Sequence, residues 1–290
     1  MKHQKLSLNT LLAALALGVS ATASAHGLPY VLPFQFHTDQ DVATLYAGNS
    51  ERYFEPEMPG GNSLNGYYDF TVTNPAGETD HVEQISRHKQ LTLIEIDTKE
   101  AGTYKVERTQ ISRVFPSVAH KGKSVDVVEK ASLDEEERKS REAEKIKDGE
   151  RRFFFDDEVK PGEIVPVQYV NHITAYVTRG KSNAAALKTG GKGFEFDFRT
   201  HPNEVSVKSG LQFIARVDGK AAAGIAFEIF RQGSDEAFRK VQSDRAGLVD
   251  VRFERAGVYV LRAEAPLESV KGGKVVNPRY INWLVVEARP

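Results

Sequence analysis

Short runs in which hydrophobic and polar residues alternate make up most of this chain. From residue 28 to 36, Leu28, Tyr30 and Leu32 begin a period of two, and Pro29 and Pro33 occupy the other face. Alternation predicts a β-strand, and prolines, which cannot donate a backbone hydrogen bond, place that strand at the edge of a sheet. Short strands separated by turn residues predict an antiparallel β-sandwich. Its other predicted strands are 41–46, 67–73, 90–97 and 101–106.

The same pattern returns after Val165. Turns at Asp218-Gly219-Lys220 and Arg255-Ala256-Gly257 place glycine where a tight turn needs a positive φ. We therefore expect a second sandwich in this half of the chain. Its predicted strands are 167–178, 194–199, 211–217, 225–231, 248–253, 258–265 and 280–287.

The intervening segment, 124–152, is dense in both charges and poor in apolar residues. Glu135 and Lys139 stand four residues apart in the order that favours a helical ion pair, and Ser132 with Glu135 has the spacing of a capping box. The pattern predicts a solvated helix or a mobile insertion rather than a core element. The predicted layout is all-β, with a sandwich over 26–115, a charged helical insertion or linker over 116–165, and a second sandwich over 166–290.

The first 25 residues have the features of a secretory signal peptide. Lys2 and Lys5 precede an apolar run, and Ala23-Ser24-Ala25 forms a small-residue cleavage site. These two lysines are among 39 basic residues, and the peptide holds none of the 40 acidic ones, so the remaining 265 residues carry a net charge of −3. That balance excludes the basic field of a nucleic-acid binder. No later stretch reaches the roughly 20 apolar residues of a membrane helix, so we expect no membrane span in the mature chain.

The chain contains no cysteine. Disulfides, thiolate chemistry and cysteine-based metal sites are therefore excluded, and any metal must bind His, carboxylate, carbonyl, the terminal amine or Met58. The sequence also lacks a G-x-S-x-G motif, a P-loop and a nucleotide-binding glycine motif, so we expect no enzymatic activity.

Cleavage after Ala25 would make His26 the first residue, with an α-amino group and an imidazole that together can chelate a transition metal. His172 is the predicted second ligand; it lies in an alternating strand and shares a face with Thr174 and Tyr176. A strand histidine is more often a satisfied structural residue, and that interpretation stays open. His81 and His88, seven residues apart, are further metal candidates at the two ends of a short strand or loop.

Three motifs of the second half occur in order: Val217-Asp218-Gly219-Lys220, Ser243-Asp244-Arg245-Ala246-Gly247 and Ala256-Gly257-Val258-Tyr259. They resemble the pattern of small Ig-like or transthyretin-like exported modules. With the signal peptide, the Ala25-His26 start and the charged middle, the mature chain resembles the family named domain of unknown function 4198. The resemblance implies two Ig-like or transthyretin-like sandwiches in the periplasm and a link with nickel and cobalt uptake. The Trp that the family usually carries near the mature start is missing here.

We therefore expect a periplasmic, non-enzymatic protein that binds or delivers a transition metal, namely nickel, cobalt or copper, with a membrane metal transporter as its partner. The alternative is a module that binds protein or carbohydrate through its edges and loops. An enzymatic alternative, a copper-dependent oxidase, would need a second histidine close to His26.

Overall fold

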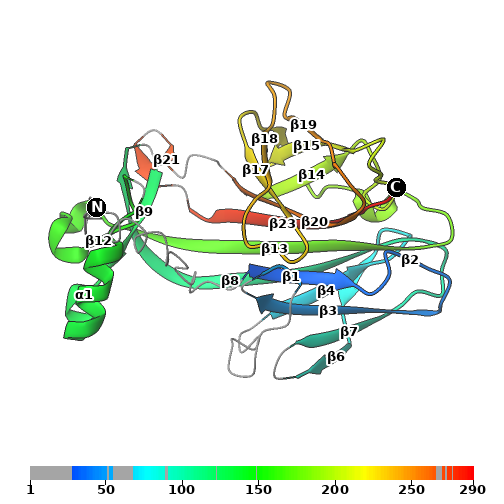
Figure 1. Ribbon diagram of the computed structural model, residues 1–290, viewed down its shortest axis with the longest axis horizontal. Coiled ribbons are helices and arrows are strands. Elements are labelled where there is room, and N and C mark those ends of the chain that lie inside the picture. Colours follow the sequence, from blue (N-terminus) through cyan, green and yellow to red (C-terminus); the bar gives the residue numbers. More distant parts are fainter. Residues whose placement is uncertain are drawn as a thin grey trace, which may run out of the picture.

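Most of the molecule is β-structure built around one large sheet (Figure 1). The computed structural model describes residues 28–50, 52–54, 68–88, 91–121, 123–147, 149–265, 270–271, 273–275 and 277–290. The predicted signal peptide and His26 lie outside these residues. The described chain is mostly β, in line with the predicted fold class, and antiparallel pairing predominates.

The central sheet has 11 strands. In spatial order its main path is β12 (Phe153–Phe155), β9 (Lys123–Val128), β8 (Gly102–His120), β13 (Val165–Arg179), β23 (Arg279–Ala288), β20 (Gly257–Ala265), β17 (Ala226–Arg231) and β18 (Arg239–Gln242). Three short strands pair with the sheet outside this path. β2 (His37–Thr38) pairs with β13, β4 (Tyr68–Thr73) pairs with β8, and β5 (Thr79–His81) pairs with β4.

Two smaller sheets pack on opposite faces of the central sheet. The N-terminal sheet consists of β1 (Leu28–Pro33), β3 (Val42–Ser50), β7 (Thr92–Asp97) and β6 (Gln84–Arg87). The C-terminal sheet consists of β14 (Phe194–Phe198), β15 (Leu211–Val217), β16 (Lys220–Ala221) and β19 (Leu248–Val251). β1 lies at the edge of its sheet, as Pro29 and Pro33 predict, because neither proline can donate to a further strand.

Each small sheet encloses its own hydrophobic core against the central sheet. On β13, Ile173 faces the N-terminal core and Tyr176 the C-terminal core; on β23, Trp283 and Leu284 divide in the same way. Successive side chains of a strand point to opposite faces, so a strand covered on both sides must be apolar throughout. This explains the unbroken apolar run at 283–286.

β13 joins the two halves of the central sheet. It pairs antiparallel with β8 and parallel with β23, which differs from the purely antiparallel expectation. The whole C-terminal sheet lies between β13 and β23 in the sequence, and a crossover of that length permits parallel pairing. The expected boundary at 115/116 falls within β8 and that at 165/166 at the start of β13. The sheet is continuous across both, and the division into domains stays a prediction.

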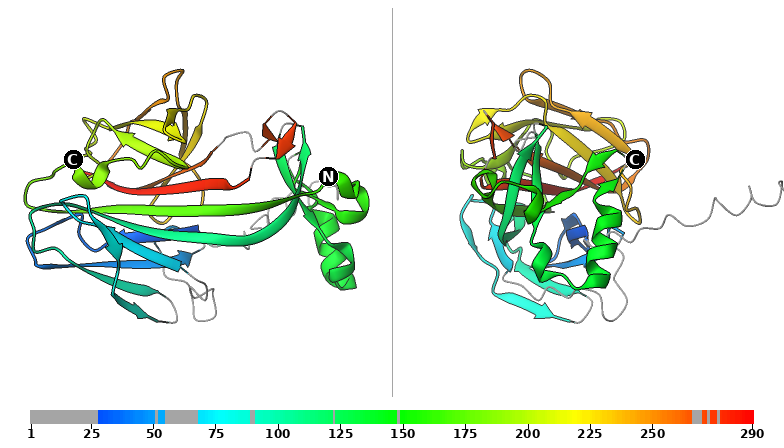
Figure 2. Two further views of the ribbon diagram at one scale, coloured as in Figure 1. Left: turned by 180° about the vertical axis from the view of Figure 1, so that it is seen from behind. Right: turned by 90° about the vertical axis from the view of Figure 1, so that its left-hand side faces the viewer.

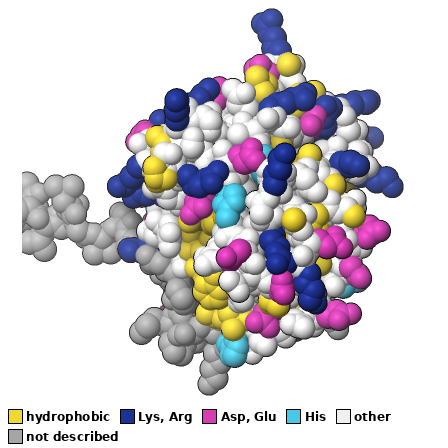
Figure 3. All heavy atoms as spheres, turned by 90° about the vertical axis from the view of Figure 1, so that its right-hand side faces the viewer, with side chains coloured by type: hydrophobic (Ala, Val, Ile, Leu, Met, Phe, Trp, Pro, Cys, Tyr) yellow, Lys and Arg dark blue, Asp and Glu magenta, His cyan; other side chains and the backbone are white. Residues whose placement is uncertain are grey.

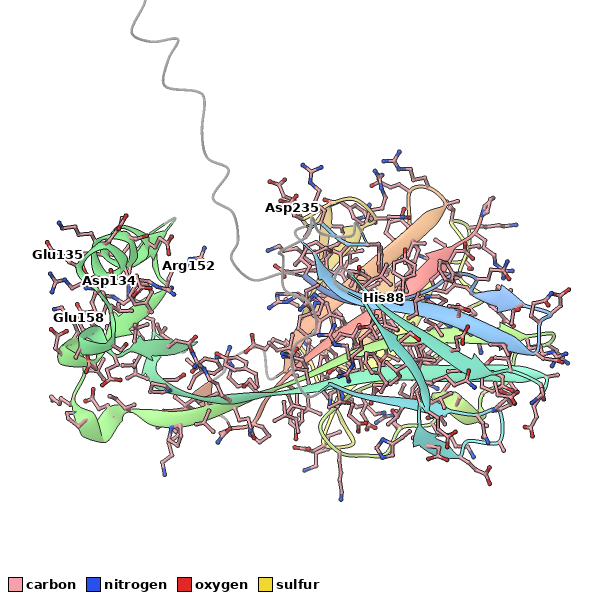
Figure 4. The ribbon with its side chains drawn as sticks, turned by 90° about the horizontal axis from the view of Figure 1, so that it is seen from below. His88, Asp134, Glu135, Arg152, Glu158 and Asp235 are labelled. Carbon is pink, nitrogen blue, oxygen red and sulfur yellow. The ribbon has the colours of Figure 1, made fainter. Side chains whose placement is uncertain are left out.

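Beyond the two cores, β8 and β13 continue to a small third cluster and to helix α1 (Glu135–Glu144), which stands at one end of the molecule (Figure 2). Asp134 caps α1, not Ser132 as predicted: its carboxylate accepts a hydrogen bond from Glu137 N at 2.8 Å, and Glu137 reaches back to Asp134 N. A short 3₁₀ turn, η2 (Lys130–Ser132), delays the start of the helix by two residues. Asp134, Glu135 and Glu158 lie together at this end, away from His88 (Figure 4).

α1 buries none of its residues, which fits the solvated helix that its charges predict. No helix in the described part of the chain is long and apolar enough to cross a membrane. The remaining short elements are β10 (Ile146–Lys147), β11 (Glu150–Arg151), β21 (Val270–Lys271), β22 (Lys274–Val275), η3 (Asp156–Glu158), η4 (Pro161–Glu163) and η5 (Ala185–Leu187).

Gly102, the first residue of β8, provides a test of this packing. Its φ of +138° is rarely adopted by other residues, and a Cβ there would lie 2.6 Å from Pro75 Cβ. We expect Gly102→Ala to lower the free energy of unfolding by about 2 kcal/mol or more in chemical denaturation. Gly162→Ala is the control, because nothing lies within 4 Å of that Cβ position. Equal losses in the two variants would contradict the packing described here.

Candidate functional site

The four histidines predicted as metal ligands are not brought together. His26 lies outside the described residues. His81 belongs to β5 of the central sheet and His88 follows β6 of the N-terminal sheet, so the chain passes from one sheet to another between them. His81 Nδ1 lies 2.8 Å from Asp69 Oδ1, with both side chains largely exposed. Within the described ranges, no three His, Asp or Glu side chains gather as a metal site.

His172 is the predicted ligand that the structure places in a cavity. A hollow of about 350 Å³ lies on the face of the central sheet opposite the N-terminal core. Strands β8, β13 and β23 form its floor, and residues 186–196, which include the start of β14, form its wall. His172, Thr174 and Tyr176 share this face, as the alternation predicts.

Strand register determines which side chains meet in the cavity. Across the β8–β13 ladder, Thr174 stands opposite Glu107 and Tyr176 opposite Lys105. Across the β13–β23 ladder, His172 stands opposite Asn282. Directly opposite residues on one face of a sheet lie within side-chain contact distance. Three strands from three distant parts of the sequence therefore contribute polar groups to one surface.

Glu107 and His172 form the central pair of this cavity. His172 Nδ1 lies 3.4 Å from Glu107 Oε1 and 3.2 Å from Thr109 Oγ1. The hydroxyl of Thr174 donates to Glu107 Oε2 at 3.3 Å, and Lys105 Nζ lies 3.8 Å from the same oxygen. Both members of the pair are mostly buried, with 24% of the His172 side chain and 23% of the Glu107 side chain exposed.

The surroundings of Glu107 keep it ionised. Burial alone would raise the pKa of its carboxyl, but this effect is outweighed by the hydrogen bond from His172, by the charge of Lys105 and by the hydroxyl of Thr174. The pKa of Glu107 falls to about 2 as a result. The cavity therefore presents an anionic oxygen beside an imidazole, two donors of the kind that borderline metals accept.

Two partly buried histidines use their nitrogens within the protein. His37 Nε2 lies 2.7 Å from Asn203 O. His201 Nε2 lies 2.9 Å from Thr103 Oγ1, and its Nδ1 accepts from Asn203 N at 3.1 Å. Burial lowers the pKa of His201, which favours its neutral form. These two histidines are structural.

A second hollow, of about 720 Å³, is apolar. Residues 32–37, which include the end of β1, line one side, and Val258 and Glu287 line the other. Phe34 leaves 63% of its side chain exposed here. Figure 3 shows hydrophobic side chains gathered on this end of the molecule. An exposed apolar patch beside polar residues is typical of an interaction surface.

The family of this chain follows from a match to a known family model. The family model described as a domain of unknown function, DUF4198, matches residues 23–266. The chain belongs to this family. No curated protein matches the chain.

Two solved structures align with this DUF4198 protein over most of its length. A crystal structure of native alpha-2-macroglobulin from Escherichia coli, spanning domains NIE-MG1, covers 85% of this chain and 94% of its own at 10% identity and a TM-score of 0.20. The D0-D1 domain of intimin covers 90% and 97% at 7% identity and a TM-score of 0.23.

Glu107 and Lys105 are among the cavity residues that sequence reasoning missed. Residues 101–106 open a predicted strand, but the residues after Val106 no longer alternate with apolar ones, so the pattern does not extend to Glu107. The signal that could have found them is the polar series Lys105, Glu107, Thr109 at period two, interleaved with buried Val106 and Arg108.

The lowered pKa of Glu107 predicts a specific pH dependence. Because the folded-state pKa lies below the ordinary 4.5, Glu107 contributes stability that is present above pH 4.5 and lost as the pH falls towards about 2. In denaturant titrations between these pH values, we expect Glu107→Gln to show a shallower loss of unfolding free energy than the wild type. His172→Gln should also flatten the profile, because it removes the main hydrogen-bond partner. An identical slope in the wild type and Glu107→Gln would refute this account of the pair.

Proposed function

We propose that this chain is exported by a cleaved signal peptide, residues 1–25, and acts in the periplasm as a non-enzymatic metal-binding or metal-delivery accessory protein. The metal is nickel, cobalt or copper, and the partner that receives it is a membrane metal transporter. In this proposal the two cores belong to two Ig-like or transthyretin-like sandwich domains, 26–115 and 166–290, with 116–165 as a charged helical insertion.

The observation that supports the proposal most directly is the Glu107–His172 pair in the solvent-open cavity. Imidazole nitrogen suits all three metals, and an ionised carboxylate adds charge that favours a cation. Two protein donors leave other coordination positions for water or for donors of a bound molecule. Easy exchange at these positions suits a protein that passes its metal on.

The position of β1 argues against a single metal site that contains both His26 and His172. Tyr30 and Leu32 of β1 pack into the N-terminal core with Ile173, whereas His172 points to the opposite face of β13. The body of β1 and the His172 imidazole thus lie on different faces of the central sheet. We therefore treat the cavity pair and the terminal chelate as two separate candidate sites.

Calorimetric titration of the chain beginning at His26 with nickel, cobalt and copper tests both sites. We expect His172→Ala to weaken binding of the preferred metal at least tenfold, because it removes one of two cavity donors. His120→Ala, which alters a histidine outside the cavity, should leave binding unchanged. Adding one residue before His26 reports on the terminal chelate. Equal binding by the wild type and His172→Ala would reject the cavity as the metal site, and binding no tighter than micromolar in every form would reject the proposal as a whole.

The apolar hollow beside Phe34 favours a second candidate function, a module that binds a protein partner or carbohydrate. It predicts a purified chain without stoichiometric metal and a partner whose capture depends on this hollow. We expect Phe34→Ser to abolish that capture and Ile111→Ser, which alters a similarly exposed side chain on β8, to preserve it. Capture that survives Phe34→Ser would exclude the hollow as the binding surface.

A further inference from the structure

One buried polar atom of the cavity lacks a partner. Asn282 lines the cavity with only 6% of its surface exposed, and its Nδ2 donates to Phe194 O at 2.6 Å. Its Oδ1 is buried and has no hydrogen-bond partner in the described part of the chain. Leaving a buried acceptor unsatisfied costs about 1–3 kcal/mol. A ligand that brings a hydroxyl or amino donor into the cavity would satisfy it.

The charges around the same cavity are unevenly compensated. The Glu107 carboxylate is engaged by His172, Lys105 and Thr174. The Glu195 carboxylate accepts hydrogen bonds from the backbone N–H groups of Gly190 and Gly191, at 2.5 and 2.8 Å. Both anionic side chains that line the cavity are thus occupied by the protein itself.

Lys188 and Lys192 remain as cations of the cavity wall. Among the described residues, neither lysine side chain forms an ion pair or a hydrogen bond. Two uncompensated ammonium groups favour a ligand with more than one negative charge. Lysine is a suitable partner for carboxylates because its three N–H donors lie at the end of a flexible stem.

From these observations we infer that the cavity binds a small hydroxy acid with two or three carboxylates. Its carboxylates pair with Lys188 and Lys192, and its hydroxyl donates to Asn282 Oδ1. The 350 Å³ volume lies at the lower end of the range for small-molecule sites, and the rings of Tyr176, Phe194 and Tyr280 supply apolar lining. The inference uses the cavity of the proposed function but does not depend on the metal.

Citrate and tricarballylate form a matched pair of probes, because they carry the same three carboxylates and differ by the hydroxyl. We expect calorimetry on the metal-free chain to show citrate binding about tenfold or more tighter than tricarballylate. The double variant Lys188→Ala/Lys192→Ala should weaken citrate binding at least tenfold. Lys208→Ala, which removes an exposed lysine outside the cavity, should leave it unchanged.

Three results would overturn the inference: no citrate binding at millimolar concentration, equal affinity for the two acids, or unchanged citrate affinity in the double lysine variant. Titrations of the double lysine variant with nickel, cobalt and copper distinguish failure of the hydroxy-acid inference from failure of the proposed metal-binding function. They should match the wild type, because neither lysine is a proposed metal donor. Citrate binding without metal binding, or the reverse, then identifies which of the two ideas fails.

Discussion

The parallel pairing of β13 with β23 is the constraint on which the rest of the structure depends. It runs from Tyr169 opposite Arg279 to Thr174 opposite Leu284 and turns two sets of strands into one sheet. A shift of one residue would send every side chain of a strand to the other face. Here both faces are core, so such a shift would exchange Trp283 for Leu284 in two cores of different shape. The register is thus specified by packing on both sides at once.

A buried polar group reinforces this register at its first pair. The guanidinium of Arg279, 8% exposed, donates to the hydroxyl of Tyr169 at 2.7 Å and to the carboxylate of Glu264 on the neighbouring strand β20. The Tyr169 hydroxyl in turn donates to Asp126 of β9. A buried charge that loses its partner is costly, so a shifted strand would leave Arg279 unpaired in the interior. This network therefore specifies the register of the strands rather than adding to net stability.

Local sequence patterns predict what depends on neighbours in the chain. Pro29 and Pro33 predict an edge strand, and alternation predicts that His172, Thr174 and Tyr176 share a face; both predictions are confirmed. β8 runs to His120 although its apolar alternation ends at Val106, because hydrogen bonds to β13 sustain the strand without that alternation. The meeting of Glu107, His172 and Asn282 depends on pairings between strands far apart in sequence. No local pattern carries that information, and the parallel direction of β23 is hidden for the same reason.

The site lies where the covering of the central sheet changes. One face of β13 is packed against a complete sheet along the N-terminal core, whereas the other face, over His172 and Thr174, is covered by residues 186–196. A packed sheet fills the space above its neighbour with side chains, but a loop leaves hollows that polar groups can line. Glu107 can stay ionised in such a hollow only because His172, Lys105 and Thr174 surround its carboxylate. Any ligand that draws His172 away from Glu107 must therefore itself stabilise the Glu107 carboxylate. A cation or a hydrogen-bond donor is favoured at this position for that reason. A simple anion is directed instead to Lys188 and Lys192 at the wall.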